Sequence, residues 1–388
     1  MSLLLKDATC VTPGRTVEDR TLVLKDGTIA RIAGSGYQPG CEAEVMDVDG
    51  NHVLPSFIDM HAHGCLGADF SDPDFPIRDG VDFLHAHGVT ALYPTLHARP
   101  WQEMKASLER GGELCSRGAG SALFRALHCE GPFLNPEMSG AAPVEALRRP
   151  TLEAWNELQN ASGGRIRVLT IAPELEGASQ VVRAAYHQGT VVSAGHSNAD
   201  YDTVMSAVDE GLREVTHLFN AMAHFHHRDP NILLAALLEP DIRVQINADG
   251  GHVHPRGMQM AYRLKGPQGI IITSDLHPAG GLPPGTHEWE GEKVENDGCL
   301  VRTADGTVAG SALPLDQGLR TMVREVGASL AEAARMASLN PAQELGLSDR
   351  KGRVAEGYDA DLAVLDENLQ VTATIADGRI VYRRDTCP

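Results

Sequence analysis

Two histidines one residue apart follow an apolar stretch near the start of the chain. The stretch runs from Val53 to Ile58, and Asp59, His61 and His63 come directly after it. Alternate residues of a strand point to the same side, so His61 and His63 can face one ion from the end of a single strand. Neutral imidazole is the commonest metal ligand in proteins. The spacing therefore indicates a metal site, whereas a loop with two solvated histidines is the alternative.

Further residues of the ligand type occur later, each at the end of an apolar run. They are His128, Glu130, His196, His217, Asp249, His252 and Asp275. A divalent ion lowers the pKa of a bound water toward about 7 and polarises a carbonyl oxygen. A neighbouring carboxylate can take a proton from that water and pass it to a leaving nitrogen. Asp275 suits that role, with a helix N-cap as its alternative, and the set favours hydrolysis of an amide or ester.

The other histidines divide into two classes. Seven are predicted to have no special role: His52, His85, His87, His97, His187, His277 and His287. His85 and His87 repeat the His-X-His spacing, but in a predicted helix, where positions i and i+2 do not share a face. His226, His227 and Arg228 are three donors in one loop. They could bind an anion such as a phosphate, for which the arginine fork is suited, or they could simply be solvated.

Strand-like apolar runs alternate with helical patterns through the middle of the chain. The predicted strands are 57–60, 89–93, 123–127, 167–171, 190–193, 214–216, 244–247 and 270–273. The predicted helices are 81–87, 101–114, 151–159, 178–188, 200–210, 255–264, 315–326 and 329–338. This α/β alternation predicts a (β/α)8 TIM-type barrel, whose active site lies at the C-terminal ends of its strands. The candidate ligands would then converge on one mouth.

Both ends of the chain have short strand patterns separated by turns. The predicted strands there are 21–25, 28–32, 361–365, 371–375 and 379–382. Asp26-Gly27 is a hairpin signal between the first two. Neither end has enough apolar surface to fold alone. We therefore expect residues 1–53 and 355–388 to form one small discontinuous β-sandwich domain beside a barrel domain of residues 54–354.

The composition restricts the possible partners. The chain of 388 residues has 33 basic and 52 acidic side chains, a net charge of −19, and no basic run. This argues against nucleic acid and against a membrane surface as partner. Seven cysteines without paired spacing predict a reducing compartment, and the N-terminus is too short in apolar length for a signal peptide. These features predict a cytoplasmic protein that acts on a small molecule.

Seven short motifs follow one another along most of the chain. They are 55–64, 128–133, 194–197, 216–222, 249–254, 274–275 and 308–311. Singly, only 130–133 and 216–222 are specific, but together the motifs are highly specific. In this order they resemble the N-acetylglucosamine-6-phosphate deacetylases of the amidohydrolase superfamily. The resemblance implies a metal-dependent barrel hydrolase with a small β domain, and a homodimer.

The resemblance also implies roles for individual residues. The implied metal ligands are Glu130, His196 and His217, with His61 and His63 for a second ion. Asp275 becomes the proton shuttle, and His252 orients or polarises the acetyl group. The implied substrate-binding residues are Ala141, Asn220, Ala221, His252, Val308, Ala309 and Gly310, with Arg228 reaching the phosphate from the partner subunit. One or two divalent ions per chain are expected, zinc first, although this ligand set also suits iron, manganese or cobalt.

Several positions depart from the family pattern near the substrate. Ala142 stands where a histidine is usual and Leu276 where a small alanine is usual; Ser56, Asn231 and the stretch 278–297 also differ. The expected reaction is hydrolysis of the acetamide of N-acetylglucosamine 6-phosphate to glucosamine 6-phosphate and acetate. The alternatives are N-acetylgalactosamine 6-phosphate, an unphosphorylated N-acetyl sugar or an N-acyl amino acid. A non-catalytic barrel is a further alternative, but such a protein would be expected to have lost ligands.

Overall fold

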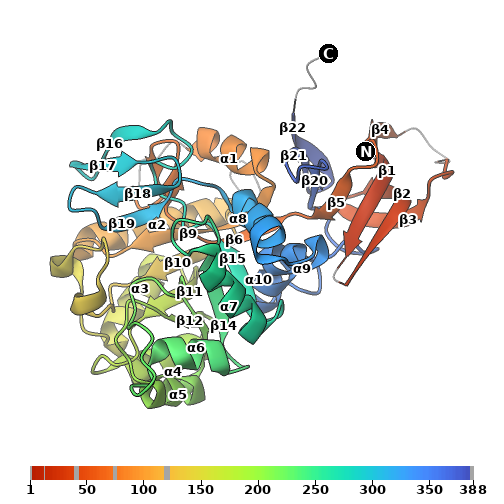
Figure 1. Ribbon diagram of the computed structural model, residues 1–388. Helices are drawn as coiled ribbons and strands as arrows, with labels where there is room; N and C mark the ends of the chain where they lie inside the picture. Colours follow the sequence, from red (N-terminus) through yellow and green to blue (C-terminus); the bar gives the residue numbers. More distant parts are fainter. Residues whose placement is uncertain (1, 13, 39–42, 73–76, 118–122, 385–388) are drawn as a thin grey trace.

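Eight parallel strands form the centre of the computed structural model, which describes residues 2–12, 14–38, 43–72, 77–117 and 123–384. They neighbour one another in chain order: β6 (Phe57–Ala62), β9 (Val89–His97), β10 (Leu127–Glu130), β11 (Ile166–Ile171), β12 (Val191–Ala194), β13 (Leu212–Val215), β14 (Arg243–Asn247) and β15 (Ile270–Thr273). Figure 1 shows them inside a layer of helices. The predicted (β/α)8 barrel is confirmed.

The third barrel strand begins later than predicted. Residues 123–126 run beside β9, and the backbone N–H of Arg125 donates to the carbonyl of Leu92. The ladder with β11 starts only at Leu127. His128 and Glu130 therefore lie within β10 and not after it. Because alternate strand residues face the same side, both point into the barrel.

The helices of the barrel largely follow the prediction. They are α1 (Ile77–Ala86), α2 (Trp101–Arg117), α3 (Leu152–Ala161), α4 (Ala178–His187), α5 (Tyr201–Glu210), α6 (Ile232–Leu238), α7 (Pro255–Lys265), α8 (Leu315–Thr321), α9 (Leu330–Ala334) and α10 (Asn340–Glu344). The prediction missed α6, whose short sequence is apolar on nearly every side and so shows no helical periodicity. Within the described ranges, no helix combines the length and the apolar character needed to cross a bilayer.

The first and last barrel strands meet at the mouth of the barrel. The backbone N–H of Asp275 donates to the carbonyl of His61 at 2.8 Å, and the N–H of His63 donates to the carbonyl of Leu276 at 2.8 Å. Ala62 and Leu276 form an isolated parallel bridge. These bonds close the barrel just after β6 and β15. They also place the His-X-His pair beside Asp275.

Side chains from the C-terminal helices fill the gap between the same strands at the opposite end. Ser338 Oγ donates to the carbonyl of Ser56 at 2.8 Å. Asn340 Nδ2 donates to the carbonyls of Pro267 and Ile270, each at 2.6 Å. Both side chains are fully buried. They donate hydrogen bonds to backbone carbonyl groups that would otherwise need a partner strand.

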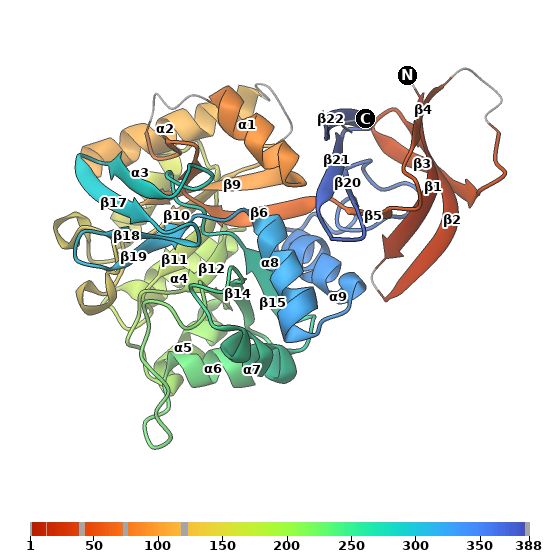
Figure 2. The same cartoon turned by 45° about the horizontal axis from the view of Figure 1, so that its top comes forward.

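The segment of the chain between β15 and α8 forms an antiparallel sheet that the sequence analysis did not predict. It consists of β16 (Gly285–Trp289), β17 (Glu292–Asn296), β18 (Leu300–Thr303) and β19 (Val308–Ser311), in that order. A short hairpin of β7 (Gly64–Cys65) and β8 (Ala68–Asp69) follows the first barrel strand. Figure 2 shows strands of the four-stranded sheet at one end of the barrel, at the left of the view.

The two ends of the chain form one small β domain, as predicted, and their strands join in a single sheet where a β-sandwich was expected. Its strands are β1 (Ser2–Thr12), β2 (Arg15–Lys25), β3 (Thr28–Gly34), β4 (Glu44–Asp47), β5 (His52–Pro55), β20 (Leu362–Leu365), β21 (Val371–Ala376) and β22 (Arg379–Arg383). Leu5 and Leu24 from one end pack in the same apolar cluster as Val364 and Ile375 from the other. The exact limits of the two domains, at residues 53/54 and 354/355, stay a prediction.

The closure of the barrel predicts the effect of one substitution. Asn340→Ala should lower the free energy of unfolding by about 1–3 kcal/mol, because buried carbonyls lose their donor. Urea unfolding of the whole chain measures this, with the exposed Asn368→Ala as the control. An unchanged free energy of unfolding would show that Asn340 does not stabilise the gap between β6 and β15.

Candidate metal centre

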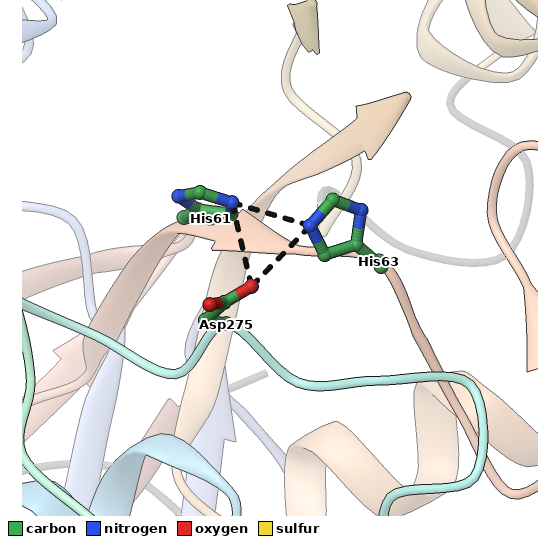
Figure 3. Close-up of side chains that lie close together, drawn as sticks. All are labelled: His61, His63 and Asp275. Atoms are coloured by element: carbon green, nitrogen blue, oxygen red, sulfur yellow. Dashed lines mark hydrogen bonds and ion pairs between the residues drawn. The ribbon is translucent and has the colours of Figure 1, made fainter. Parts of the chain in front are cut away.

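Residues from the first and last barrel strands form the first group of possible metal ligands. The Nε2 atoms of His61 and His63 lie 3.3 Å apart. Asp275 Oδ1 lies 3.5 Å from the Nε2 of His61 and 3.3 Å from that of His63. Figure 3 shows the three side chains turned toward one another. All three are buried.

Glu130, His196 and His217 form a second group beside the first. Glu130 Oε1 lies 3.3 Å from the Nε2 of each of these histidines, and the two Nε2 atoms are 3.0 Å apart. The same carboxylate also faces the first group. Its oxygens lie 3.4 Å from His61 Nε2 and 3.2 Å from His63 Nε2. Glu130 is therefore placed between the two groups, where it could bridge two ions.

The hydrogen bonds made by the Nδ1 atoms of His61 and His196 leave the Nε2 atoms free to bind a metal ion. His61 Nδ1 lies 3.0 Å from Gln245 Oε1, whose amide group donates to Glu214 at 2.6 Å. His196 Nδ1 lies 2.8 Å from the carbonyl of Met138. In both cases Nδ1 must carry the hydrogen, so Nε2 presents a lone pair. Such outer partners orient the histidines of metal sites.

The donor set fits a divalent cation. Two ligands of a tetrahedral zinc ion, with bonds of about 2.0–2.1 Å, lie about 3.3 Å apart. The corresponding separations within the two groups are 3.0–3.5 Å. Among the described residues, the buried Glu130 Oε1 and His217 Nδ1 have no hydrogen-bond partner. A buried carboxylate oxygen without a donor is costly unless a cation compensates it.

The electrostatics of the centre also favour positive charge. Burial opposes ionisation of Glu130, but the surrounding histidines hold its pKa well below the usual range. Burial likewise opposes protonation of His63, yet Asp275 and Glu130 outweigh it and raise the pKa of His63 to about 10. Two carboxylates in one buried site thus attract either a proton or a metal ion.

The two oxygens of Asp275 have different surroundings. Oδ1 faces the histidines of the first group, whereas Oδ2 accepts a hydrogen bond from Asn247 Nδ2 at 2.8 Å. His252 Nε2 lies 3.4 Å from Oδ2. The other side of the His252 ring is held by Asp249, with Nδ1 and Oδ2 2.7 Å apart. Asn247 and His252 therefore fix the orientation of the Asp275 carboxylate.

Asp59, the carboxylate that precedes the His-X-His pair, has a structural position. It is fully buried and accepts hydrogen bonds from Ser274 Oγ at 2.6 Å and from the backbone N–H of His61 at 3.2 Å. Burial raises its pKa to about 6. Asp59 thus joins the residue before Asp275 to the strand that carries His61.

A cavity of about 240 Å³ lies above this centre. The predicted site residues that line it are His63, Glu130, Ala141, His196, His217, Asn220, Ala221, His252, Asp275, Val308, Ala309 and Gly310. His61 is 0% exposed and lies beneath them. Of the departures from the family pattern, Ala142 lines the cavity, whereas Leu276 is buried in the closure of the barrel.

Arg228 lies away from the cavity of its own chain. Residues 224–230 form an exposed loop between β13 and α6. In Figure 2 a green loop of this part of the chain projects from the body of the molecule. The Arg228 guanidinium donates to His227 Nε2 at 2.9 Å. The structure therefore does not bring Arg228 to the other predicted site residues of the same chain.

Among the lining residues without a predicted role, three carry an aromatic ring: His97, His277 and Trp289. His97 and His277, which the sequence analysis took as ordinary histidines, thus lie at the cavity. His97 is the last residue of β9, so the rule that barrel sites lie at strand ends could have found it. Trp289 ends β16, and no signal in the sequence placed that strand above the barrel.

His128 lies deeper in the barrel than the metal centre. Its Nδ1 lies 3.1 Å from Thr95 Oγ1 and its Nε2 lies 2.8 Å from Thr170 Oγ1. Burial and the neighbouring His61 keep its pKa well below the usual range. Because both ring nitrogens are occupied, His128 supports the ring of His61, 4.7 Å away between ring centres, and is no ligand.

Known proteins share this sequence over almost its whole length. The Amidohydrolase family matches residues 52–381. The N-acetylglucosamine-6-phosphate deacetylase of Homo sapiens is 36% identical, over 98% of this chain and 93% of its own. The N-acetylgalactosamine-6-phosphate deacetylase of Escherichia coli O157:H7 is 34% identical, over 98% of this chain and 99% of its own.

A solved structure agrees with these matches. It shows a variant of the N-acetyl-D-glucosamine-6-phosphate deacetylase from Mycobacterium smegmatis in complex with N-acetyl-D-glucosamine-6-phosphate. It is 28% identical, with a TM-score of 0.90 over 98% of this chain and 99% of that one. The chain therefore belongs to the amidohydrolase family, in the branch that contains these deacetylases.

Proposed function

We propose that the protein hydrolyses the acetamide of N-acetylglucosamine 6-phosphate, giving glucosamine 6-phosphate and acetate. The observation that carries this proposal is the position of the Glu130 carboxylate between two groups of ligand atoms, at the floor of a cavity that also contains Asp275 and His252. Such an arrangement suits metal-dependent attack of water on an amide. The names of the relatives support this substrate.

We propose that Glu130, His196 and His217 hold one divalent ion and that His61 and His63, with Asp275, hold a second. Zinc suits the mixed imidazole and carboxylate ligands best, and iron, manganese or cobalt would also be accepted. When bound, such an ion supplies a water of lowered pKa and polarises the carbonyl oxygen.

Asp275 is the proposed proton shuttle. Its Oδ1 accepts a proton from the attacking water as the new C–O bond forms at the carbonyl carbon. The same oxygen then gives this proton to the amide nitrogen as the C–N bond breaks, which yields the free amine and acetic acid. Loss of the acid proton to the more basic amine then leaves acetate and the ammonium form of the amine. Asn247 holds Oδ2 during both transfers. We assign His252 to orienting the acetyl carbonyl, because its ring is fixed by Asp249.

We propose that the sugar lies along Ala141, Asn220, Ala221 and the turn 308–310, and that Arg228 of one protomer binds the phosphate of its partner in a homodimer. The exposed position of Arg228, outside its own cavity, supports the second part. A cytoplasmic location is proposed as well. The five cysteines within the described ranges, which are all unpaired, support it.

N-acetylgalactosamine 6-phosphate is the second candidate substrate. Ala142 lines the cavity in place of the usual histidine, and a relative with that activity is 34% identical. Deacetylation of both phosphorylated epimers, free N-acetylglucosamine and an N-acetyl amino acid by the metal-loaded enzyme distinguishes these possibilities. The proposed function requires the highest kcat/KM for N-acetylglucosamine 6-phosphate.

The first prediction from the proposed function concerns the metal content of the protein. The purified protein should contain about one to two equivalents of a divalent transition metal per chain. His196→Ala should lower this content and the activity together, because it removes a ligand, whereas the exposed His187→Ala should change neither. Elemental analysis measures the content. Full activity of metal-free protein would contradict the proposal.

The role of Asp275 gives the second prediction. Asp275→Asn should lower kcat by about 10²-fold or more, the contribution of general acid–base catalysis, with KM nearly unchanged. The exposed Asp305→Asn is the matched control. Because Asp275 also faces the first ligand group, kcat is compared at equal metal content. A kcat near that of the unchanged enzyme would show that Asp275 moves no proton.

The role of Arg228 gives the third prediction. Arg228→Ala should lower kcat/KM for phosphorylated substrate by about 10- to 150-fold, which corresponds to about 1.5–3 kcal/mol for a charged hydrogen bond. Activity on the free sugar should stay the same, and the exposed Arg256→Ala should affect neither substrate. If the enzyme prefers the free sugar and Arg228→Ala affects both alike, the phosphate assignment is wrong.

A further inference from the structure

The hairpin of β16 and β17 carries an aromatic side chain over one side of the cavity. Trp289 lines the cavity together with His97 and His277. The ring centre of Trp289 lies 4.7 Å from that of His277 in an edge-to-face contact and 5.4 Å from that of His97. We call these three residues the aromatic wall. Nothing in the mechanism above uses it.

Polar contacts hold the tip of the hairpin in place. Trp289 Nε1 donates to Asp69 Oδ2 at 2.9 Å. Glu290 Oε1 lies 2.6 Å from a guanidinium nitrogen of Arg99 and 3.1 Å from His97 Nε2. Glu290 has φ +52°, a left-handed conformation that residues other than glycine rarely adopt. Such a backbone conformation persists only where the surrounding contacts hold it. The contacts of Glu290 therefore fix the position of the neighbouring Trp289 and of the aromatic wall.

The buried face of the wall contains a donor without a partner. His277 is 1% exposed, and its Nδ1 accepts a hydrogen bond from the backbone N–H of Ala279 at 3.0 Å. The hydrogen must therefore be on Nε2, which has no hydrogen-bond partner among the described residues. The edge of the ring meets the indole of Trp289. This contact fixes the two rings against each other and keeps that side of the cavity aromatic.

The wall lies across the barrel mouth from Asn220 and Ala221, whereas the turn 308–310 runs beside His277, whose backbone N–H donates to the carbonyl of Ser311 at 2.9 Å. His97 ends β9, His277 follows β15, and β6 lies between these strands in the barrel. The ring centre of His97 is 5.9 Å from that of His63. Asn220 and Ala221 follow β13, on the far side of the ring of strands. The metal ligands lie between the two sides.

An amide held at those ligands has two substituents that leave the carbonyl group in opposite directions. If the amine part extends toward Asn220 and Ala221, the acyl part extends toward His63 and the aromatic wall. We propose that the aromatic wall receives the acyl group and that Trp289 limits its length to that of acetyl. This inference rests on the proposed function, because it takes the sugar to lie beside Asn220.

The ratio of activities on substrates of different acyl length tests the inference. N-acetyl-, N-propionyl- and N-butyryl-glucosamine 6-phosphate are compared with the metal-loaded enzyme. Trp289→Ala should raise kcat/KM for the butyryl substrate, relative to the acetyl substrate, by about tenfold or more, because each methylene in an apolar pocket changes selectivity by about that factor. Trp289→Phe, which keeps an aromatic ring, should shift the ratio less.

Trp101→Ala is the matched control. Trp101 begins α2 and its indole contacts Arg148, so its loss should leave the acyl ratio unchanged. Glu290→Gln provides a second test that keeps the indole, and it should move the ratio in the same direction as Trp289→Ala. The inference is overturned if Trp289→Ala changes the preference between sugars while the acyl ratio stays constant. If the unchanged enzyme deacylates none of the three substrates, the proposed function is wrong and the inference falls with it.

Discussion

A buried carboxylate surrounded by imidazoles is the constraint on which the rest of this structure depends. Glu130 is 6% exposed, and four imidazole nitrogens lie within 3.4 Å of its oxygens. Charge removed from water in this way is costly unless an opposite charge compensates it. Neutral histidines cannot supply that charge, but a cation shared by the carboxylate and the histidines can. The five candidate ligands other than Asp275 would therefore need one another, although they come from four different barrel strands or the turns that follow them.

The barrel is closed by the same residues to which we assign the chemistry. Between β6 and β15 the closing bonds at the mouth involve the backbone of His61, His63 and Asp275, and Asp59 adds a side-chain bond to Ser274. A shift of one strand against the other would break these bonds and separate Asp275 from the His-X-His pair. At the far end, Ser338 and Asn340 fill the remaining gap. The contacts that close the barrel between β6 and β15 thus stabilise the fold and also set the geometry of the site.

Local pattern predicted the barrel, and it placed the candidate ligand residues at one end of that barrel. Periodicity indicated the eight strands, and the rule that barrel sites lie at strand ends brought Glu130, His196, His217 and Asp275 together before any distance was known. The start of β10 was misplaced because residues 123–126 run beside β9 before the ladder with β11 begins. The sheet of β16 to β19 was missed because its position above the mouth depends on contacts between distant residues, such as Trp289 with Asp69. His277, in contrast, follows β15, so the strand-end rule could have found it as it could have found His97.

X-ray absorption at the edge of the bound metal tests the central claim most directly. The account predicts a shell of nitrogen and oxygen ligands at about 2.0–2.2 Å, with the multiple scattering of several imidazoles. Glu130→Gln should change that shell, since it removes the carboxylate between the two groups. A sulfur shell at about 2.3 Å would contradict the account, because it would place the metal on a cysteine such as the buried Cys129 and not on Glu130 and the histidines.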